Sequence, residues 1–261
     1  MESKKIVIID GNSLIHRAYY ALPLLSNKRG EYTNAVYGFV NMLYKILDDY
    51  DPDYISVAFD RKAPTFRHLE YDDYKAGRKR MPDELAQQLP VLKEVLDAFR
   101  IHRMELDGFE ADDLIGTLVK FCEGQGIDAI VVTGDKDALQ LASQKTKILI
   151  TKKGISSLEE YNADGVMEKY EITPKQFIDL KGLMGDPSDN IPGVPGVGEK
   201  TAIKLIKEFG SIEELIRNTG KISSAKLREK IEAYAQQAVF SKRLATIMVD
   251  VPLEITLEEL K

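Results

Sequence analysis

Short apolar runs recur through the first 160 residues, each bounded by a turn or a helical pattern. They occupy residues 4–10, 54–60, 101–106 and 128–137, with one or two further short strands in 147–154 and 155–161. Uninterrupted apolar runs of this length are typical of strands that are buried on both faces of a parallel sheet.

Apolar residues spaced by three and four positions predict helices between these strands. These helices are expected at residues 35–50, 83–99 and 108–125, after a loop and short helix over 11–23. Pro90 is expected to kink the second of them. From residue 162 onward nearly every segment has helical spacing, and residues 249–261 have the pattern of a linker or edge segment. The order predicts an α/β protein with a mostly parallel central sheet and a helical second part.

Three of the strands end in an aspartate, at Asp10, Asp60 and Asp135. The carboxyl ends of parallel strands meet at one edge of a sheet, so these side chains are expected to converge. Six more acids flank them in the sequence: Glu110, Asp112, Asp113, Asp137, Asp186 and Asp189. Each acid alone is explained equally well as a helix cap or a surface residue. Nine together would repel strongly unless cations lay between them, and an all-oxygen ligand set indicates two Mg²⁺ or Mn²⁺ ions.

Residues 185–202, GDPSDNIPGVPGVGEKTA, join two of these acids to a loop rich in Pro and Gly. We interpret the stretch as a helix–hairpin–helix whose second helix begins near Lys200. Backbone N–H groups at such a helix start can hold a phosphate without reading a base. Candidate DNA-binding residues are therefore Gly193, Gly196, Gly198, Lys200 and Thr201.

Residues 61–82 break the pattern and carry seven Lys or Arg against three acids. They have no apolar face long enough to bury, so a mobile or partly helical excursion is expected. A charge run is often only a solvated face, but this one directly follows Asp60. If the segment is helical, Lys75 and Arg78 share a face and could contact a phosphate, while Tyr74 could stack on a base or pack internally.

Composition limits the possible chemistry. The net charge of −6 argues at first against a nucleic-acid partner, but outside the nine candidate ligands the 36 basic residues slightly outnumber the acids. The single Cys122 lies in an apolar helical pattern, which predicts a core thiol and fits a reducing cytosol. His16, His68 and His102 have no metal-binding spacing and are expected to be structural or exposed. No apolar run approaches about 18 residues, so no membrane span is expected.

Seven motifs occur in an order that resembles the 5′-nuclease (flap endonuclease) superfamily: IIDGNSL, NAVYGF, VAFD, YKAGR, GFEADDLIG, VTGDKDALQL and GDPSDNIPGVPGVGEKTA. The resemblance covers roughly residues 4–261 and is greatest to the N-terminal 5′→3′ exonuclease domains of bacterial DNA polymerases I. It implies a PIN-like core over residues 1–160 with a helical arch at about 61–90. The helical part, 161–261, would contain a helix–three-turn–helix motif at about 183–217.

The resemblance also implies roles for individual residues. The family's metal ligands fall on all nine acids named above, and Mg²⁺ or Mn²⁺ would be the cofactor, with K⁺ as a further implied ion at the hairpin loop. Catalytic roles fall on Lys75, Arg78, Asp112 and Asp135. Contacts to DNA fall on Arg67, Tyr74, Lys75 and Arg78, and on the hairpin residues.

The implied activity is a structure-specific, metal-dependent 5′→3′ exonuclease and 5′-flap endonuclease that acts in RNA primer removal and DNA repair. Expected partners are flap, nicked or gapped duplexes with a 5′ single strand, and RNA primer–DNA hybrids. The resemblance suggests a monomeric domain fragment from the bacterial cytosol, fused to or working with a polymerase. Three alternatives stay open: a non-catalytic DNA-binding module, a PIN-type ribonuclease, and a phosphatase that forms an aspartyl phosphate.

Overall fold

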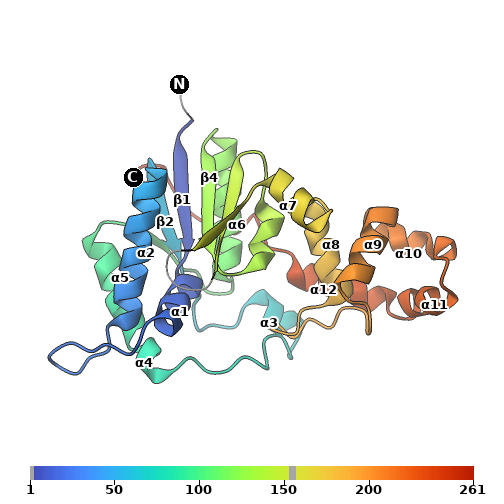
Figure 1. Cartoon of the computed structure of the whole chain (residues 1–261), viewed down its shortest axis with the longest axis horizontal. Coiled ribbons are helices and arrows are strands. Elements are labelled where there is room, and N and C mark those ends of the chain that lie inside the picture. The colour runs from blue at the N-terminus through green and yellow to red at the C-terminus, as the bar shows by residue number, and fades with distance from the viewer. Residues whose placement is uncertain (1–2, 153–156) are drawn as a thin grey trace.

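The computed structural model describes residues 3–152 and 157–261 (Figure 1). Residues 153–156, predicted to lie where two short strands adjoin, are outside the described part. A six-stranded sheet has the order β3-β2-β1-β4-β5-β6. Its strands are β1 (Lys5–Asp10), β2 (Tyr54–Ala58), β3 (His102–Met104), β4 (Asp128–Thr133), β5 (Thr146–Thr151) and β6 (Leu158–Tyr161). Every neighbouring pair is parallel except β5 with β6, so the predicted mostly parallel sheet is confirmed.

Helices cover both faces of this sheet. Successive residues of a strand point to opposite faces, and in β1 Ile6 and Ile8 join one core cluster whereas Val7 and Ile9 join the other. The first cluster includes α6 (Ala111–Gly124), and the second includes α1 (Gly11–Ala21), α2 (Asn34–Tyr50) and α5 (Gln88–Ala98). Figure 1 shows α2 and α5 on one side of the sheet and α6 on the other. The continuous apolar strands are thus explained by burial on two sides.

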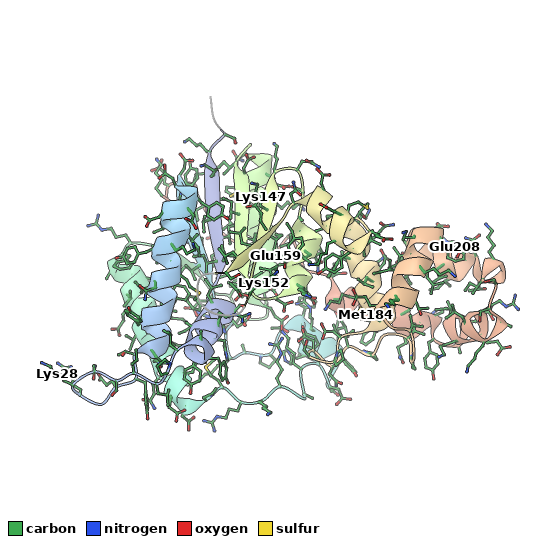
Figure 2. All side chains as sticks on the ribbon, in the orientation of Figure 1. Lys28, Lys147, Lys152, Glu159, Met184 and Glu208 are labelled. Atoms are coloured by element: carbon green, nitrogen blue, oxygen red, sulfur yellow. The ribbon has the colours of Figure 1, made fainter. Side chains whose placement is uncertain are left out.

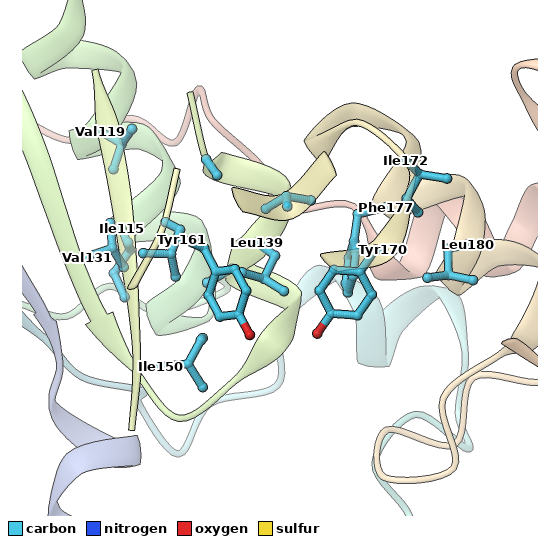
Figure 3. Close-up of a cluster of buried hydrophobic side chains, with 14 of the residues drawn as sticks. Ile115, Val119, Val131, Leu139, Ile150, Tyr161, Tyr170, Ile172, Phe177 and Leu180 are labelled. Carbon is cyan, nitrogen blue, oxygen red and sulfur yellow. The ribbon is translucent and has the colours of Figure 1, made fainter. Parts of the chain in front are cut away.

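The second part of the chain is helical and shares the first core cluster. Its helices are α7 (Ala163–Tyr170), α8 (Pro174–Met184), α9 (Glu199–Phe209), α10 (Ile212–Arg217), α11 (Ala225–Ala233) and α12 (Ala235–Ala245), with a 3₁₀ turn η2 (Thr219–Lys221). The rings of Tyr161 and Tyr170 lie 6.4 Å apart, and those of Tyr170 and Phe177 lie 5.3 Å apart. These aromatic contacts carry the core from the sheet edge into the helices (Figure 3).

Two helical regions are divided differently from the prediction, and the basic segment is partly helical, as expected. Residues 83–99 form α4 (Asp83–Ala86) and α5, so the helix expected to kink at Pro90 is interrupted at Gln87. Pro90 lies in the first turn of α5, where N–H groups have no partner within the helix. The continuous helical spacing after residue 224 is divided between α11 and α12 at Tyr234. The basic segment contains only α3 (Phe66–Glu70) and turns. Lys75 has φ of 57°, so Lys75 and Arg78 do not share a helix face.

The last residues of the chain return to the sheet. Met248 N–H donates to Asp113 Oδ1 at 2.8 Å, and Val251 N–H donates to Thr117 Oγ1 at 3.1 Å. Ile55 N–H at the start of β2 donates to the carbonyl of Leu260 at 2.8 Å. The tail therefore packs against α6 and β2 without forming a strand, which favours the packed segment over the linker that its pattern also allowed.

Charged pairs cover the β5–β6 edge of the sheet. Lys147 pairs with Glu160 at 2.9 Å, and Lys152 pairs with Glu159 at 3.0 Å (Figure 2). Charges at an edge discourage pairing with another strand. Within residues 3–152 and 157–261, no helix is both long and apolar enough to cross a membrane.

Candidate active site

A cleft of about 700 Å³ opens beyond the carboxyl ends of β1, β2 and β4. The chain builds β2 and β3 on one side of β1 and β4 to β6 on the other, and crevices form at such switch points of parallel sheets. The structure brings five of the predicted acids to this cleft: Asp10, Asp60, Glu110, Asp112 and Asp135. Lys75 and Arg78 also line it, so both signs of charge meet in one space.

Hydrogen bonds hold the acids at the ends of β1 and β2. Asp10 Oδ1 accepts the Ser13 N–H at 2.9 Å, and its Oδ2 accepts the Thr133 hydroxyl at 2.7 Å. Asp60 Oδ1 accepts the Ala111 N–H at 2.8 Å. Asp10 therefore caps α1, as the helix-cap interpretation predicted, and Asp60 accepts a hydrogen bond from the first turn of α6. Both acids nevertheless line the cleft.

Burial and mutual repulsion weaken the acidity of this group. Burial raises the pKa of Asp10 to about 7, and the charges of Asp60 and Asp135 add to the rise. Burial also raises the pKa of Asp112 well above its usual range, and here repulsion comes from Asp10 first and then from Asp135. Carboxylates that disturb one another in this way favour a bound cation.

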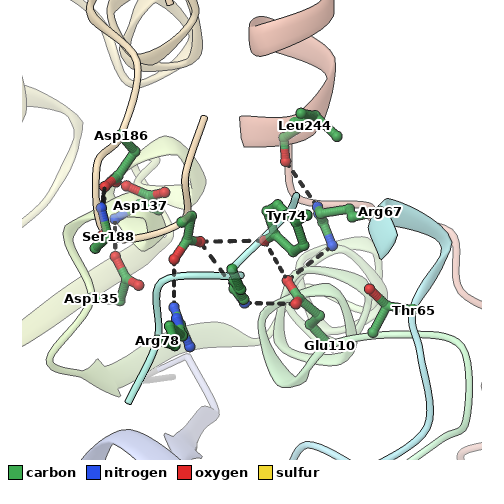
Figure 4. A network of polar contacts seen from close by, with 12 residues as sticks. Thr65, Arg67, Tyr74, Arg78, Glu110, Asp135, Asp137, Asp186, Ser188 and Leu244 are labelled. Atoms are coloured by element: carbon green, nitrogen blue, oxygen red, sulfur yellow. Dashed lines mark hydrogen bonds and ion pairs between the residues drawn. The ribbon is translucent and has the colours of Figure 1, made fainter. Parts of the chain in front are cut away.

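A network of basic and phenolic groups joins Glu110 to Asp189 (Figure 4). Lys75 Nζ lies 2.6 Å from Glu110 Oε1 and 3.8 Å from Asp189 Oδ2. Arg78 pairs with Asp189 Oδ1 at 2.6 Å. The Tyr74 hydroxyl donates to Glu110 Oε2 at 3.0 Å and lies 3.3 Å from Asp189 Oδ2. The basic segment is therefore docked on the turn that carries Asp189.

This docking corrects the base-stacking interpretation of Tyr74. Only 4% of Tyr74 is exposed, and its ring packs with Ile191 and Leu244. Burial raises the pKa of its hydroxyl, and the charges of Glu110 and Asp189 add to this. A buried ring with a bonded hydroxyl has no face free for a base, so the internal packing alternative is the one that the structure supports.

Asp113 and Arg67 are also placed differently from their predicted roles. Asp113 is fully buried, and its two oxygens receive the Arg67 guanidinium at 2.7 and 2.8 Å. Arg67 is 3% exposed and also donates to the carbonyls of Leu244 and Thr246 at 2.8 and 2.7 Å. This pair ties α3 to α6 and to the end of α12. Neither side chain faces the cleft, because neighbouring residues on a helix point about 100° apart and Asp113 faces inward from Asp112.

Asp137 and Asp186 form a second acidic group beside the cleft. Both contact the same cation, Lys181 on α8, at 2.6 and 2.5 Å. Burial raises the pKa of Asp137 to about 7, with Asp135 adding to the rise. Burial opposes ionisation of Asp186 too, but hydrogen bonds from Lys181 and Ser188 lower its pKa overall. Asp186 and Ile191 exchange two backbone hydrogen bonds, which close the turn that carries Asp189.

The donor set has the chemistry of a site for a hard divalent cation. It consists of carboxylates, it is largely buried, and several of its members repel one another. The acids are spread around the cleft rather than gathered. Among the described residues no three Asp, Glu, His or Cys side chains stand close enough to share one metal ion. Lys75, Arg78 and Lys181 instead supply the positive charge.

In the hairpin loop, the backbone at Gly193 crosses close to the backbone at Gly185. Gly193 has φ of 59°, and a Cβ there would lie 2.2 Å from the Gly185 nitrogen. Ser241 and Gln237 of α12 hold the Gly193 peptide by hydrogen bonds of 3.0 and 2.7 Å. Gly198 is the residue before α9, as the sequence predicted for a helix near Lys200. Gly196, Gly198 and Lys200 are exposed, and Thr201 is half-buried.

Sequence reasoning missed several residues of the site. Lys181 carried no signal beyond its place in the last turn of a helix, five residues before Asp186. His16, Arg17, Tyr20 and Ser188 line the cleft, and the His16 ring stacks on Tyr20 with centroids 6.5 Å apart. The periodicity of α1, which follows directly from Asp10, would have placed His16 and Tyr20 on one face at i and i+4. His68 caps α3 and His102 contacts Ser56, which fits their predicted structural roles.

Comparison with known proteins covers nearly the whole chain. Residues 5–171 match the 5′-3′ exonuclease N-terminal resolvase-like domain, and residues 172–261 match the 5′-3′ exonuclease C-terminal SAM fold. The chain is 54% identical to DNA polymerase I of Bacillus subtilis over 260 residues, with 100% of this chain and 30% of that protein covered. It is 52% identical to DNA polymerase I of Geobacillus stearothermophilus over 256 residues, with 98% and 29% covered. The chain thus spans about 30% of the length of these relatives.

Solved structures share the fold. A T5 5′-exonuclease with bound divalent metal ions (zinc) superposes with a TM-score of 0.77 at 24% identity, covering 93% of this chain and 89% of that one. The catalytic core of Rad2 in complex with DNA substrate gives a TM-score of 0.61 at 18% identity, covering 95% and 80%. Because the two family models together match residues 5–261, this chain belongs to the 5′-3′ exonuclease family.

Proposed function

We propose that this chain is a divalent-metal-dependent 5′ nuclease that cuts phosphodiester bonds at or near the junction of a duplex and a 5′ single strand. The observation that carries the proposal is the cleft at the sheet switch point, where five acids face Lys75 and Arg78. The family supports it, as do the structures of similar fold that are described with metal ions or DNA. Substrates would be flap, nicked or gapped duplexes and RNA primer–DNA hybrids.

The acids would hold two Mg²⁺ or Mn²⁺ ions, which would supply an activated water and stabilise the leaving oxygen. Asp10, Asp60, Glu110, Asp112 and Asp135 are the ligands that the cleft favours, with Asp137, Asp186 and Asp189 from its side. Asp113 is left out of this set because Arg67 occupies both of its oxygens. We propose Mg²⁺ or Mn²⁺ as the ion because both prefer oxygen ligands.

Lys75 and Arg78 would act on the substrate phosphate. Both cations already lie at the cleft wall, and their carboxylate partners Glu110 and Asp189 belong to the proposed ligand set. A phosphate entering between them would exchange one anionic partner for another, and the cations would orient it and offset its charge. Asp112 and Asp135, at the centre of the acidic group, would set the position of the attacking water.

The hairpin loop would grip the duplex away from the cut. Gly196, Gly198 and Lys200 are exposed at the start of α9, where N–H groups favour a phosphate, and Thr201 follows them. We also propose that carbonyl groups of the hairpin loop bind K⁺. We infer a two-part monomer, with residues 1–160 cutting and 161–261 holding duplex. In the bacterial cytosol it would be fused to or working with a polymerase in primer removal and repair.

The test is cleavage of a 5′-labelled flap duplex and of an unstructured RNA of equal length. We expect products at the flap junction with Mg²⁺, none in EDTA, little cleavage of the RNA, and none by the variant Asp135→Ala/Asp137→Ala. Equal cleavage in EDTA would refute the metal requirement. Preference for the RNA would favour a PIN-type ribonuclease, and binding without cutting at any metal concentration would favour a DNA-binding module.

A further inference from the structure

Lys181 lies between two acids beside the cleft. Its Nζ is 2.6 Å from Asp137 Oδ1 and 2.5 Å from Asp186 Oδ2, and its side chain is only 13% exposed. The acids come from different parts of the chain, Asp137 from the 3₁₀ turn η1 (Lys136–Leu141) and Asp186 from the loop after α8. Figure 4 shows the two carboxylates next to each other. One cation therefore bridges the sheet core and the hairpin loop.

Asp137 depends on Lys181 for its positive charge, since this is its one ion pair among the described residues. Asp137 Oδ1 is buried, and the Lys181 ammonium at 2.6 Å is the one cation that contacts it among the described residues. Asp186, in contrast, receives Lys181 and both donors of Ser188. A buried carboxylate whose charge is offset by one cation alone needs another cation in its place when that cation leaves.

We propose that Lys181 is an internal counter-ion that competes with a divalent metal for Asp137 and Asp186. The inference rests on the metal dependence of the proposed function, and it adds a residue that controls metal affinity. A single positive charge held at 2.5 to 2.6 Å from both acids occupies the space in which a shared metal would bind. Metal binding would then require the ammonium group to move away.

A different role for Lys181 predicts the opposite result. If the lysine only scaffolded the acids, its loss would let them move apart and would weaken metal binding. If it competes, its loss removes both a rival charge and a repulsion, so metal binding tightens. In both cases the metal-free protein loses stability, because two nearly buried carboxylates lose their cation. The sign of the change in metal affinity separates the two roles.

The chain offers a matched control in Lys242 on α12. Its Nζ also lies between two acids, 2.6 Å from Asp179 and 2.8 Å from Glu213, and its side chain is 23% exposed. Neither acid lines the cleft or belongs to the proposed ligand set. Replacement of Lys242 should therefore destabilise the fold in the same manner without changing metal affinity.

The experiment measures Mn²⁺ binding by the free-ion electron paramagnetic resonance signal, together with the melting temperature in EDTA and in Mn²⁺. For Lys181→Met we expect a lower melting temperature in EDTA, a larger gain on adding Mn²⁺, and Mn²⁺ binding tightened about threefold or more. Lys181→Arg should bind Mn²⁺ like the native chain. Lys242→Met should melt earlier but show native Mn²⁺ affinity.

Unchanged or weaker Mn²⁺ binding by Lys181→Met would overturn the inference, as would the absence of Mn²⁺ binding by the native chain. Lysine footprinting of the native protein covers the case in which the variant does not fold. Mn²⁺ should raise the labelling of Lys181 and leave that of Lys242 unchanged, and equal labelling of Lys181 with and without Mn²⁺ would refute competition. If Mn²⁺ displaces Lys181 but no flap is cut, the nuclease proposal fails and the inference about Lys181 stands.

Discussion

At the scale of single residues, neighbouring acids have different roles. Asp112 faces Asp10 and Asp135 in the cleft, whereas Asp113 is fully buried against Arg67. The sequence predicted an acidic constellation because residue types and strand ends are visible in it. It did not predict which carboxylate of α6 would face the cleft. Arg67, the partner that holds Asp113 away from the cleft, lies 46 residues away in the chain.

Asp10 gives a prediction for the pH dependence of stability. Its folded pKa is about 7, against 3.8 for an ordinary aspartate, so between these values the folded protein holds a proton that the unfolded chain releases. Stability from this group therefore falls as pH rises from about 4 to 7. In EDTA, Asp10→Asn should gain stability relative to the native chain over this range, by up to a few kcal/mol at about 1.4 kcal/mol per pKa unit.

Urea unfolding at several pH values measures this difference. The free energies of unfolding of the two proteins should diverge steadily between about pH 4 and 7 and then run parallel. Curves that stay parallel throughout would show that Asp10 ionises normally in the folded state, so that neither burial nor the neighbouring acids raise its pKa.

At the scale of elements, apolar runs located four strands and the region of the last two, and periodicity located most helices. The basic segment was the hardest part, because charged residues without an apolar face leave its path to tertiary contacts. Lys75 N–H donates to the Asp189 carbonyl at 3.0 Å and Asn190 Nδ2 donates to the Asp73 carbonyl at 2.7 Å, which fixes the segment on a loop more than 110 residues later. Local propensity cannot encode such a contact.

The glycines of the hairpin loop should differ in their tolerance of a methyl group. At Gly193 a Cβ would overlap the Gly185 nitrogen, and φ is positive, whereas Gly198 has no atom within 4 Å of the new Cβ. Gly193→Ala should therefore lower the free energy of unfolding by about 1–3 kcal/mol and weaken duplex binding, and Gly198→Ala should unfold like the native chain.

Denaturant unfolding and fluorescence anisotropy with an uncut duplex in EDTA check both effects. Equal stability of Gly193→Ala and Gly198→Ala would mean that the backbone crossing at Gly185 and Gly193 is not what shapes the loop.

At the scale of the whole molecule, the alternation of strands and helices predicted the sheet and the edge at which the acids collect. The strand order places β1 at the switch point, and Asp10 at its end therefore lines the cleft. The C-terminal tail returns to β2 through the Leu260 carbonyl. Its sequence predicted a linker or edge segment but did not indicate which strand it would contact. Its partner is some 200 residues away, and no periodicity indicates it.

The most direct test of the account is the single-turnover rate at which Asp112→Asn cuts a 5′-flap duplex in saturating Mg²⁺. Asp112 lies in the cleft among the four other acids, and Asn keeps its shape while removing its charge. With native folding verified by circular dichroism, we expect the rate to fall by about 100-fold or more, since metal-assisted charge stabilisation is worth several kcal/mol. A rate within about twofold of the native chain would contradict the claim that this cleft performs the cleavage.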